Sequence, residues 1–496
     1  MIIFANFVGK LDENSNEIDT YMSTRRVFLK GVSLATAGMT LNPASVFAMT
    51  SKETKQAKSE KVKIAYIGIG NRGQQNIEEF ARTNMVDGVA LCDVDLQCKQ
   101  CEKVLSMYPD AKRFTDFRKL FEEYGDHFDA VAASVPDHIH FFVAMMALKY
   151  GKHIYLEKPM TRTFQEAELL MEMAKRHPEI ATQVGNQGHS EANYFQFKAW
   201  MEAGIIKDVT AVTAHMNEAR RWHKYDWNMI KMPEGVPIPV GMDYDTWHGG
   251  VRYHDFSPLY HQGDWRSWYD FGMGALGDWG AHILDTVHEF LNLGLPYEIN
   301  MLYSKCHNEF FYPFSSTILF RFGARGNMPP CDITWYDGVD NLPPLPAGYG
   351  KSELAANIPT TNQGVYEDKK EKVNPGKIIY SRDLIFKGGS HGSTLKIIPE
   401  EKAKEMESKL PEVPKSPSNH YVNFLRACQG TEKTRSPFEV NGVLSQVFCL
   451  GVIAQRLNAQ LFFDPRTKRF TNNEFANAML TGMPPRRGWE EFYKID

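Results

Sequence analysis

The chain has 496 residues, of which 56 are basic and 60 acidic, so its formal net charge is −4. A charge this close to balance indicates neither a nucleic-acid-binding surface nor an acidic tail. The length is enough for two or three domains with sizeable cores. Seven cysteines at irregular spacing do not predict a disulfide framework.

The first 60 residues predict a leader, an export signal and a linker. Residues 23–30 carry a twin-arginine pattern, and a weakly apolar stretch with a plausible cleavage site near Ala48 follows it. That stretch is too short and too polar to remain as a transmembrane helix. A chance pair of arginines is the alternative. We therefore expect a periplasmic protein that is exported folded by the twin-arginine route, with no membrane contact after export.

Residues 61–73 hold the motif on which most of the interpretation depends. A strand-like apolar run ends in Gly68-Ile69-Gly70-Asn71-Arg72-Gly73, and an amphipathic helix pattern follows. In such a turn Gly68 allows the tight bend, Gly70 lets the backbone approach a pyrophosphate, and Gly73 lets the helix pack close to the strand. The helix N-terminus then offers free N–H groups to the anion. The motif predicts a dinucleotide site.

Asp93 supports this prediction and bears on the choice of cofactor. It ends the next strand and follows Gly70 by 23 residues, close to the ~20 expected for the acid that binds the adenosine ribose. Val94 comes next, and no Arg or Ser stands beside Asp93 to receive a 2′-phosphate. The sequence therefore favours NAD over NADP.

Strand-like and helix-like segments alternate from residue 61 to about residue 185. We expect strands at 62–67, 86–95, 128–134, 153–157 and 179–185, and helices at 75–82, 95–108, 117–125, 138–150 and 164–177. The alternation predicts a doubly wound parallel sheet of Rossmann type. Residues 136–140 and 157–159 then follow strand ends, where such sheets bind their ligands.

The motifs GIGNRG, Asp93, VPDHIH (135–140) and EKP (157–159) together resemble the Gfo/Idh/MocA family of glucose-fructose oxidoreductases and inositol dehydrogenases, in its secreted bacterial branch. The resemblance covers essentially all of residues 61–496. It implies that Lys158 reaches the reacting carbon of a sugar or polyol, that Pro136 and His140 line the nicotinamide side, and that Glu157 belongs to the cofactor site. A surface lysine and a packed histidine are the alternatives for Lys158 and His140.

After residue 185 the sequence pattern changes. A helix at 191–204 and a strand at 208–220 precede a poorly regular region, 220–274, that holds five Trp and four His. Aromatic faces beside charged and imidazole groups suit a sugar, although a packed interface is the alternative. The His spacing does not recur, so no metal site is expected. The candidate substrate-binding residues are Asn186, His223, Trp265 and Arg266.

Residues 272–294 read as a helix with a polar face. Asp278, His282, Asp285 and Glu289 share that face, which could be merely solvated. The pattern Asp278-Trp279-Gly280-Ala281-His282 resembles the third motif of the same family, which implies that Asp278 and His282 meet Lys158 over the nicotinamide.

The remaining chain predicts a large, mostly antiparallel sheet with one covered face, and covering helices at 419–429 and 441–458. Strands are expected at 297–304, 316–322, 331–336, 377–388 and 393–398. We therefore divide the chain into residues 1–60, a Rossmann domain at 61–185, and an α+β domain at 186–496 for substrate binding and oligomerisation. The resemblance implies a homo-dimer or homo-tetramer.

These observations predict an NAD(P)-dependent oxidoreductase that acts on a CH–OH group of a sugar, polyol or glycoside, with tightly bound NAD. His282 is the expected base, with Lys158 hydrogen-bonding the reacting oxygen and Asp278 orienting the pair. Lys158 could be the base if burial lowers its pKa. One alternative is an NAD-dependent glycosidase that works through a transient keto-sugar, and another is a non-catalytic sugar-binding protein.

Cys98 and Cys101 form a C-x-x-C pattern. Their flanking residues are typical of a helix surface, which favours a plain structural role over a redox or metal-binding one.

Overall fold

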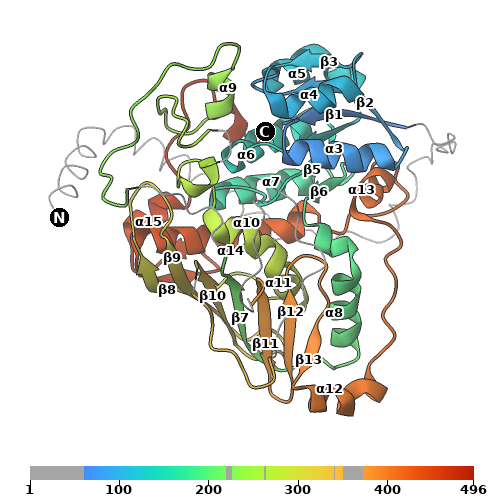
Figure 1. Ribbon diagram of the computed structural model, residues 1–496, viewed down its shortest axis with the longest axis vertical. Coiled ribbons are helices and arrows are strands. Elements are labelled where there is room, and N and C mark those ends of the chain that lie inside the picture. The colour runs from blue at the N-terminus through green and yellow to red at the C-terminus, as the bar shows by residue number, and fades with distance from the viewer. Residues whose placement is uncertain (1–60, 219–225, 262–263, 340, 350–372, 496) are drawn as a thin grey trace, which may run out of the picture. The chain divides into compact units, whose positions relative to one another are not determined.

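The computed structural model describes residues 61–218, 226–261, 264–339, 341–349 and 373–495. The predicted export signal and linker lie outside the described residues. Residues 60–496 cluster as one unit. In its described part this unit contains a six-stranded and a nine-stranded sheet (Figure 1).

The first sheet is parallel throughout and has the strand order β3-β2-β1-β4-β5-β6. Its strands are β1 (Val62–Ile67), β2 (Val86–Cys92), β3 (Lys112–Phe114), β4 (Ala130–Ala133), β5 (His153–Leu156) and β6 (Thr182–Val184). Its helices are α3 (Arg72–Arg82), α4 (Glu102–Met107), α5 (Phe117–Tyr124), α6 (Asp137–Lys149) and α7 (Phe164–Arg176). The strand order reverses between β1 and β4, and ligands bind at such a switch point. The predicted Rossmann-type sheet is confirmed.

The apolar run in β1 arises because both faces of the first sheet are covered. Successive side chains of a strand point to opposite faces. Accordingly Ile64 and Tyr66 pack in one core with Phe80 of α3, while Ala65 and Ile67 pack in the other with α6 and α7.

The second sheet has the order β13-β12-β11-β7-β10-β9-β8-β14-β15, and only β7 and β10 pair in parallel. Its strands are β7 (Val209–Met216), β8 (Glu298–Lys305), β9 (Ser315–Phe322), β10 (Cys331–Asp337), β11 (Gly376–Ser381), β12 (Ile385–Gly389), β13 (Lys396–Ile398), β14 (Gln460–Asp464) and β15 (Arg469–Phe470). The expectation of a mostly antiparallel sheet is confirmed.

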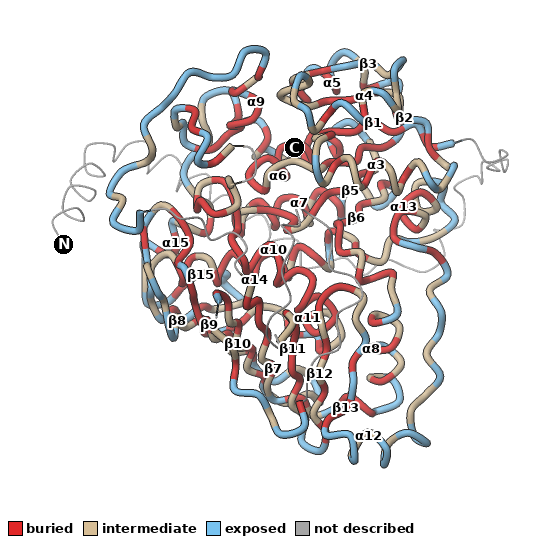
Figure 2. The backbone as a smooth tube through the Cα atoms, viewed as in Figure 1, coloured by how far each residue is buried: buried red, intermediate tan, exposed pale blue. Residues whose placement is uncertain are grey.

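Helices cover one face of this second sheet. The helices of this layer are α8 (Ala192–Glu202), α10 (Gly274–Ile283), α11 (Asp285–Phe290) and α14 (Phe438–Leu457). The other helices of this part of the chain are α9 (Tyr244–His248), α12 (Glu400–Met406), α13 (His420–Cys428) and α15 (Glu474–Met479). The 3-10 helices are η1 (Lys99–Cys101), η2 (Gly125–His127), η3 (Gln187–Ser190), η4 (Asp264–Ser267), η5 (Glu407–Lys409) and η6 (Glu490–Tyr493). Figure 2 shows α10 and α14 buried inside the fold.

Helix α14 is long and apolar enough to cross a bilayer, but 83% of its apolar window is buried in the protein. It packs against α7, α10 and the second sheet. Its apolar character is therefore explained by a core position.

Several elements differ from the sequence prediction. Strands β3, β14 and β15 and helices α12 and α15 were not predicted, and the helix expected over 95–108 begins only at η1 and α4. Two further differences affect the site. The helix expected over 272–294 is interrupted at Leu284, which separates α10 from α11. The segment 377–388 is a hairpin of β11 and β12, not one strand, because the chain turns where Leu384 N–H and O bond Ser381. Both changes matter below, since α10 and the end of β12 carry residues of the site.

Candidate active site

The glycine turn after β1 excludes side chains at two of its three glycines. A Cβ on Gly68, whose φ is +78°, would lie 2.4 Å from the carbonyl oxygen of Ser134. A Cβ on Gly73 would lie 1.9 Å from the carbonyl oxygen of Gly68. Asn71 precedes α3, and its side chain makes no capping hydrogen bond to it. The Asn71 side chain therefore leaves the first backbone N–H groups of α3 uncapped, and uncapped N–H groups at a helix N-terminus can bind an anionic ligand.

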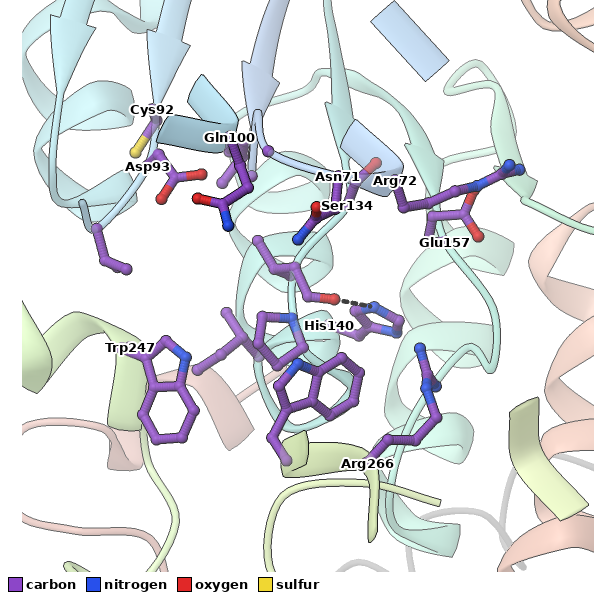
Figure 3. Close-up of a pocket in the computed structure, with 18 of the residues that line it drawn as sticks. Asn71, Arg72, Cys92, Asp93, Gln100, Ser134, His140, Glu157, Trp247 and Arg266 are labelled. Atoms are coloured by element: carbon purple, nitrogen blue, oxygen red, sulfur yellow. Dashed lines mark hydrogen bonds and ion pairs between the residues drawn. The ribbon is translucent and has the colours of Figure 1, made fainter. Parts of the chain in front are cut away.

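A cavity of about 290 Å³ opens beside this turn, between the carboxyl ends of β2, β4 and β5 and helix α10. Figure 3 shows Asp93 on one side of it and Arg266 on the opposite side. The predicted site residues that line it are Gly68, Gly70, Asn71, Arg72, Asp93, Pro136, His140, Glu157, Lys158, Trp265, Arg266, Asp278 and His282. Residues from distant parts of the chain therefore meet at one cavity.

Asp93 joins the end of β2 to the glycine turn. Its Oδ2 accepts a hydrogen bond from the backbone N–H of Ile69 at 2.9 Å, and its Oδ1 accepts one from Asp95 at 3.2 Å. Burial raises the pKa of this carboxyl, while these hydrogen bonds oppose the rise. A carboxyl at one end of the cavity and a glycine turn beside it fit the ribose and pyrophosphate of a dinucleotide.

Glu157 supports the glycine turn through Arg72. Its Oε1 accepts hydrogen bonds from Arg72 Nε and Asn76 Nδ2, both at 2.9 Å. Burial acts to raise the pKa of Glu157, but the charges of Arg72 and Lys158 lower it overall, so the carboxylate stays ionised. Glu157 therefore fixes the first turn of α3 as well as lining the cavity.

Lys158 belongs to a buried chain of alternating charges. Its Nζ lies 2.6 Å from Asp278 Oδ1 and also donates to the Asp278 carbonyl at 3.0 Å. Arg266 Nε lies 3.6 Å from the same carboxylate, and its Nη1 lies 2.7 Å from Asp137 Oδ1. Burial lowers the pKa of Lys158, which Asp278 opposes and Arg266 reinforces. The ammonium is thus positioned by Asp278 and made more acidic than an ordinary lysine.

His282 lies one helical turn beyond Asp278 on α10 and lines the same cavity. Its ring stacks on that of His391, with centroids 3.9 Å apart. Burial and then the charge of His391 lower the pKa of His282 well below its ordinary 6.5. Its Nδ1 is buried and has no hydrogen-bond partner among the described residues. His282 is therefore a neutral imidazole able to take up a proton.

His140 has both ring nitrogens placed against carbonyl oxygens. Nδ1 lies 2.6 Å from Pro159 O. Nε2 lies 2.9 Å from Val135 O, and Figure 3 marks this contact by a dashed line at His140. Burial lowers the pKa of His140, and a neutral imidazole donates through only one nitrogen. His140 therefore links the segments after β4 and β5, and Pro136, in the segment after β4, lines the cavity.

Two family models match this chain and together cover most of it. Residues 62–185 match the oxidoreductase family with the NAD-binding Rossmann fold, Gfo/Idh/MocA. Residues 192–310 and 364–491 match the C-terminal alpha/beta domain of the same oxidoreductase family. The chain belongs to the Gfo/Idh/MocA oxidoreductase family. The cavity of this Gfo/Idh/MocA protein opens at the carboxyl ends of the strands that match the NAD-binding Rossmann fold.

Curated relatives match only part of this Gfo/Idh/MocA chain. A glycosyl hydrolase family 109 protein of Shewanella baltica is 28% identical over 226 residues, which are 41% of this chain and 47% of that protein. An uncharacterised oxidoreductase of Schizosaccharomyces pombe is 28% identical over 144 residues, 29% of this chain and 37% of that protein. The chain thus spans about half or less of the length of these relatives.

Solved structures share the fold at low identity. The WlbA dehydrogenase of Bordetella pertussis, in complex with NADH and UDP-GlcNAcA, has a TM-score of 0.52 and 12% identity, and the match covers 82% of this chain and 99% of that one. The aldose-aldose oxidoreductase of Caulobacter crescentus, complexed with glycerol, also has a TM-score of 0.52 and 12% identity, with 82% and 100% covered. At this identity the likeness concerns the fold alone.

The remaining predicted residues have varied positions. Trp265 and Arg266 line the cavity, with the guanidinium 4.3 Å from the indole centroid. Asn186 is buried, and its amide donates to the Ala281 carbonyl at 2.8 Å, so it holds α10 instead of lining the cavity. His223 lies outside the described residues.

Part of the aromatic region predicted for a sugar site forms a small core of its own. Trp247, Tyr260, Trp268 and Phe271 are buried together, and of these only Trp247 lines the cavity. Many aromatic side chains of region 220–274 therefore pack within the protein, which neither of the two sequence interpretations described.

Asp285 and Glu289 do not share the cavity with Asp278 and His282, although one polar face was predicted for all four. Asp285 Oδ2 lies 3.6 Å from His189 Nε2, and Glu289 Oε1 accepts from the Tyr194 hydroxyl at 3.1 Å. On one continuous helix the four residues would share a face, but the interruption at Leu284 separates α10 from α11, so the two pairs lie in different surroundings.

The sequence interpretation missed His391, which lines the cavity after β12. The sequence offered one signal for this residue: a single imidazole in the Gly-rich connection 388–392, between two predicted strands. Short loops held by a sheet often carry functional groups. Gln100, Gln187 and Trp279 also line the cavity and were not predicted as site residues. Trp247 and His261 line it as well, and both belong to the aromatic region predicted for a sugar site.

Proposed function

We propose that this oxidoreductase oxidises a CH–OH group of a sugar, polyol or glycoside at a tightly bound NAD. One observation carries the proposal. Lys158 lies 2.6 Å from Asp278, and His282 follows one turn later on α10, at the cavity that the glycine turn and Asp93 also line. A hydrogen-bond donor and a proton acceptor thereby face one dinucleotide site, as the removal of a carbinol proton requires.

The chain's own residues supply the proton chemistry, and a nicotinamide, when bound, supplies the hydride acceptor. The neutral His282 accepts the hydroxyl proton. Lys158 stays protonated beside Asp278 and donates a hydrogen bond to the same oxygen, which stabilises the charge that develops there. Because the pKa of Lys158 is lowered, a proton passed from substrate to lysine is the competing assignment.

The choice of NAD over NADP rests on Asp93. Its carboxylate ends β2 and is followed by Val94, so the negative charge opposes a 2′-phosphate and no cation beside it in sequence compensates. The Bordetella structure was solved with NADH, which agrees with this choice for the fold.

A second candidate is an NAD-dependent glycosidase. Glycosyl hydrolase family 109 proteins at 25–28% identity support it. In that reaction the hydroxyl is oxidised to a ketone, the carbon next to the ketone loses a proton as the aglycone leaves, water adds to the resulting double bond, and the ketone is reduced again. The same Lys158 and His282 would serve the oxidation and the reduction. Net oxidation stops at the ketone, whereas net hydrolysis continues through elimination, addition of water and reduction.

We also propose that the protein acts in the periplasm after twin-arginine export, as a homo-dimer or homo-tetramer, with residues 61–185 and 186–496 as its two domains. The motif at residues 23–30 supports the export route. The family resemblance supports the assembly.

The test begins with denaturation of the purified protein and detection of released NAD(H) by absorbance and mass. The NAD-loaded protein is then mixed rapidly with a panel of glycosides, and reduction of the bound cofactor is followed in a single turnover. We expect Lys158→Met and His282→Ala to slow this step by roughly 10²–10⁴-fold. Exposed Lys119→Met is the matched control.

Unchanged single-turnover rates in both site variants would contradict the assignment. The two candidate reactions separate with a chromogenic glycoside in D₂O. A keto product without free aglycone indicates net oxidation. Free aglycone with deuterium at the carbon next to the oxidised one indicates the glycosidase.

A further inference from the structure

Cys98 lines the cavity and Cys101 is buried behind it, so the pair does not lie on a helix surface as predicted. The N–H of Cys101 donates to the carbonyl of Cys98 at 3.0 Å, which closes a turn that leads into η1 and α4. An i→i+3 turn holds its end Cα atoms within ~7 Å, a separation that a disulfide spans. The two Sγ atoms are 3.0 Å apart. The backbone therefore already has a shape that permits a bond between them.

The two thiols differ in access. Cys98 is half-buried and lines the cavity, whereas Cys101 is fully buried behind it. The hydrogen bond between them lowers the pKa of Cys98 and raises that of Cys101. An accessible thiol with a lowered pKa and an adjacent second thiol is the arrangement that exchanges with external disulfides.

The same turn contacts the parts of the site that bind the dinucleotide. Gln100 stands between the cysteines, and a Cβ on Gly70 would lie 3.1 Å from its Cβ. Figure 3 shows Gln100 beside Asp93. Hydrogen bonding by the Cys101 thiol also acts on Asp93, where it opposes the rise in pKa caused by burial. A change at the two thiols therefore reaches both the glycine turn and the ribose-binding carboxyl.

We propose that Cys98 and Cys101 form a reversible disulfide that locks the ribose end of the dinucleotide site. The proposal rests on the dinucleotide site and on no particular substrate. A metal site is the other common use of C-x-x-C. However, the described residues contain no group of three or more His, Cys, Asp or Glu side chains that could hold a metal ion.

The oxidant is a small-molecule or protein disulfide. The Cys98 thiolate attacks one of its sulfurs, its S–S bond breaks, and one thiol leaves. Cys101 then loses its proton and attacks the Cys98 sulfur of the mixed disulfide, which releases the second thiol. Two protein thiols are thereby oxidised and one external disulfide is reduced to two thiols, so atoms and electrons balance.

The disulfide holds Gln100 against the glycine turn and so removes part of the ordering that dinucleotide binding otherwise requires. By linkage, NAD then favours the disulfide by the same factor as the disulfide favours NAD. The proposed export route supplies an order of events. The cofactor binds in the reducing cytoplasm, and the lock closes in an oxidising compartment.

The test is a redox titration of the full chain in glutathione buffers, from reducing to oxidising, with and without added NAD. Free thiols are alkylated at each point, and peptide mass mapping identifies the linked cysteines. We expect a disulfide between Cys98 and Cys101. Added NAD should change the equilibrium constant for its formation by roughly 3- to 10-fold in favour of the oxidised form. NAD should leave the oxidised protein more slowly by a similar factor. Cys98→Ser should abolish this redox dependence, and Cys306→Ser, at a half-buried thiol after β8, should keep it.

A linkage absent in oxidising buffer, or made to a different cysteine, would overturn the proposal. A Cys98–Cys101 disulfide whose redox midpoint is the same with and without NAD would contradict the proposed coupling between the disulfide and NAD binding. A protein that retains no NAD in either redox state would contradict the proposed function as well as the lock, and mass mapping distinguishes this from failure of the linkage. Because the wild-type protein is titrated, the result does not depend on the folding of any variant.

Discussion

The imidazole of His282 stacks on the imidazole of His391, with ring planes 20° from parallel and centroids 3.9 Å apart. The backbone N–H of His391 also donates to the His282 carbonyl at 3.1 Å, so the loop after β12 is fixed to α10 by both backbone and ring. Two imidazoles at this distance oppose each other's protonation. The pair therefore favours a neutral His282, the state in which it can accept a proton.

His391 should set the acidic limb of the pH–rate profile. His282 must be neutral to act as the base, and its pKa lies well below 6.5, so activity of the wild-type protein should persist to pH values below 6.5. In His391→Phe the ring contact remains but the opposing charge is lost, so the pKa of His282 rises and the limb moves to higher pH. The measurement is kcat against pH, with NAD content confirmed for each protein. A wild-type limb at or above pH 6.5 would contradict this account.

Asp93→Ser should weaken NAD binding and relax the discrimination against NADP. The substitution removes the carboxylate that opposes a 2′-phosphate and also the acceptor for Ile69 N–H. We expect a loss of roughly 10-fold or more in NADH affinity, with a smaller loss for NADPH. Titration of intrinsic fluorescence measures both, and Asp87→Asn, at an exposed position of β2, is the control. Equal losses for the two cofactors would contradict the assignment.

Substitutions at two glycines of the turn should affect stability and NAD binding differently. At Gly73 an added Cβ meets the Gly68 carbonyl at 1.9 Å, so Gly73→Ala should lower both the stability of the protein and its NAD content. At Gly70 the nearest atom is the Cβ of Gln100 at 3.1 Å, so a methyl group needs a movement of only a few tenths of an ångström. Gly70→Ala should therefore keep its denaturation midpoint and lose NAD. The measurements are urea denaturation and NAD released per chain, and a normal NAD content in Gly70→Ala would show that the turn does not approach the cofactor.

Buried neutral histidines should make the protein sensitive to acid. Burial lowers the pKa of His138 to about 3, that of His420 to about 3 and that of His288 to about 4. In the unfolded chain each binds a proton below pH ~6.5, so the unfolded state takes up more protons and stability falls as pH decreases from 6.5. As the pH falls from about 6 to 4, each such histidine should lower the free energy of unfolding by up to ~1.4 kcal/mol per pH unit.

The pH dependence can be measured by urea denaturation at a series of pH values. His288→Gln should reduce the slope of unfolding free energy against pH by about one proton. His127→Gln, at an exposed imidazole, is the control. An unfolding free energy that is constant from pH 7 to 5 would contradict the prediction.

Five of the six strands of the first sheet were predictable because their signals are local, whereas the three-residue β3 was not predicted. Short apolar runs that alternate with helical patterns, the glycine turn and the acid after the second strand each depend on residues within about one strand–helix unit. The face predicted for Asp278, His282, Asp285 and Glu289 was correct only for the first pair, since helical spacing says which residues neighbour each other but not what packs against them. The sequence likewise placed Cys98 and Cys101 on a surface, because no local pattern shows that Gly70 comes to lie against Gln100.

By itself, the sequence determined the parallel sheet, the dinucleotide turn and the lysine that follows β5, since short-range periodicity and turn chemistry act within a few residues. Only the tertiary structure decided that Lys158 pairs with Asp278, 120 residues later in the chain, and that His391 stacks on His282. Such contacts form when helices and loops from both sheets pack around one cavity. Their geometry depends on the long-range burial of apolar faces, which a local pattern does not encode.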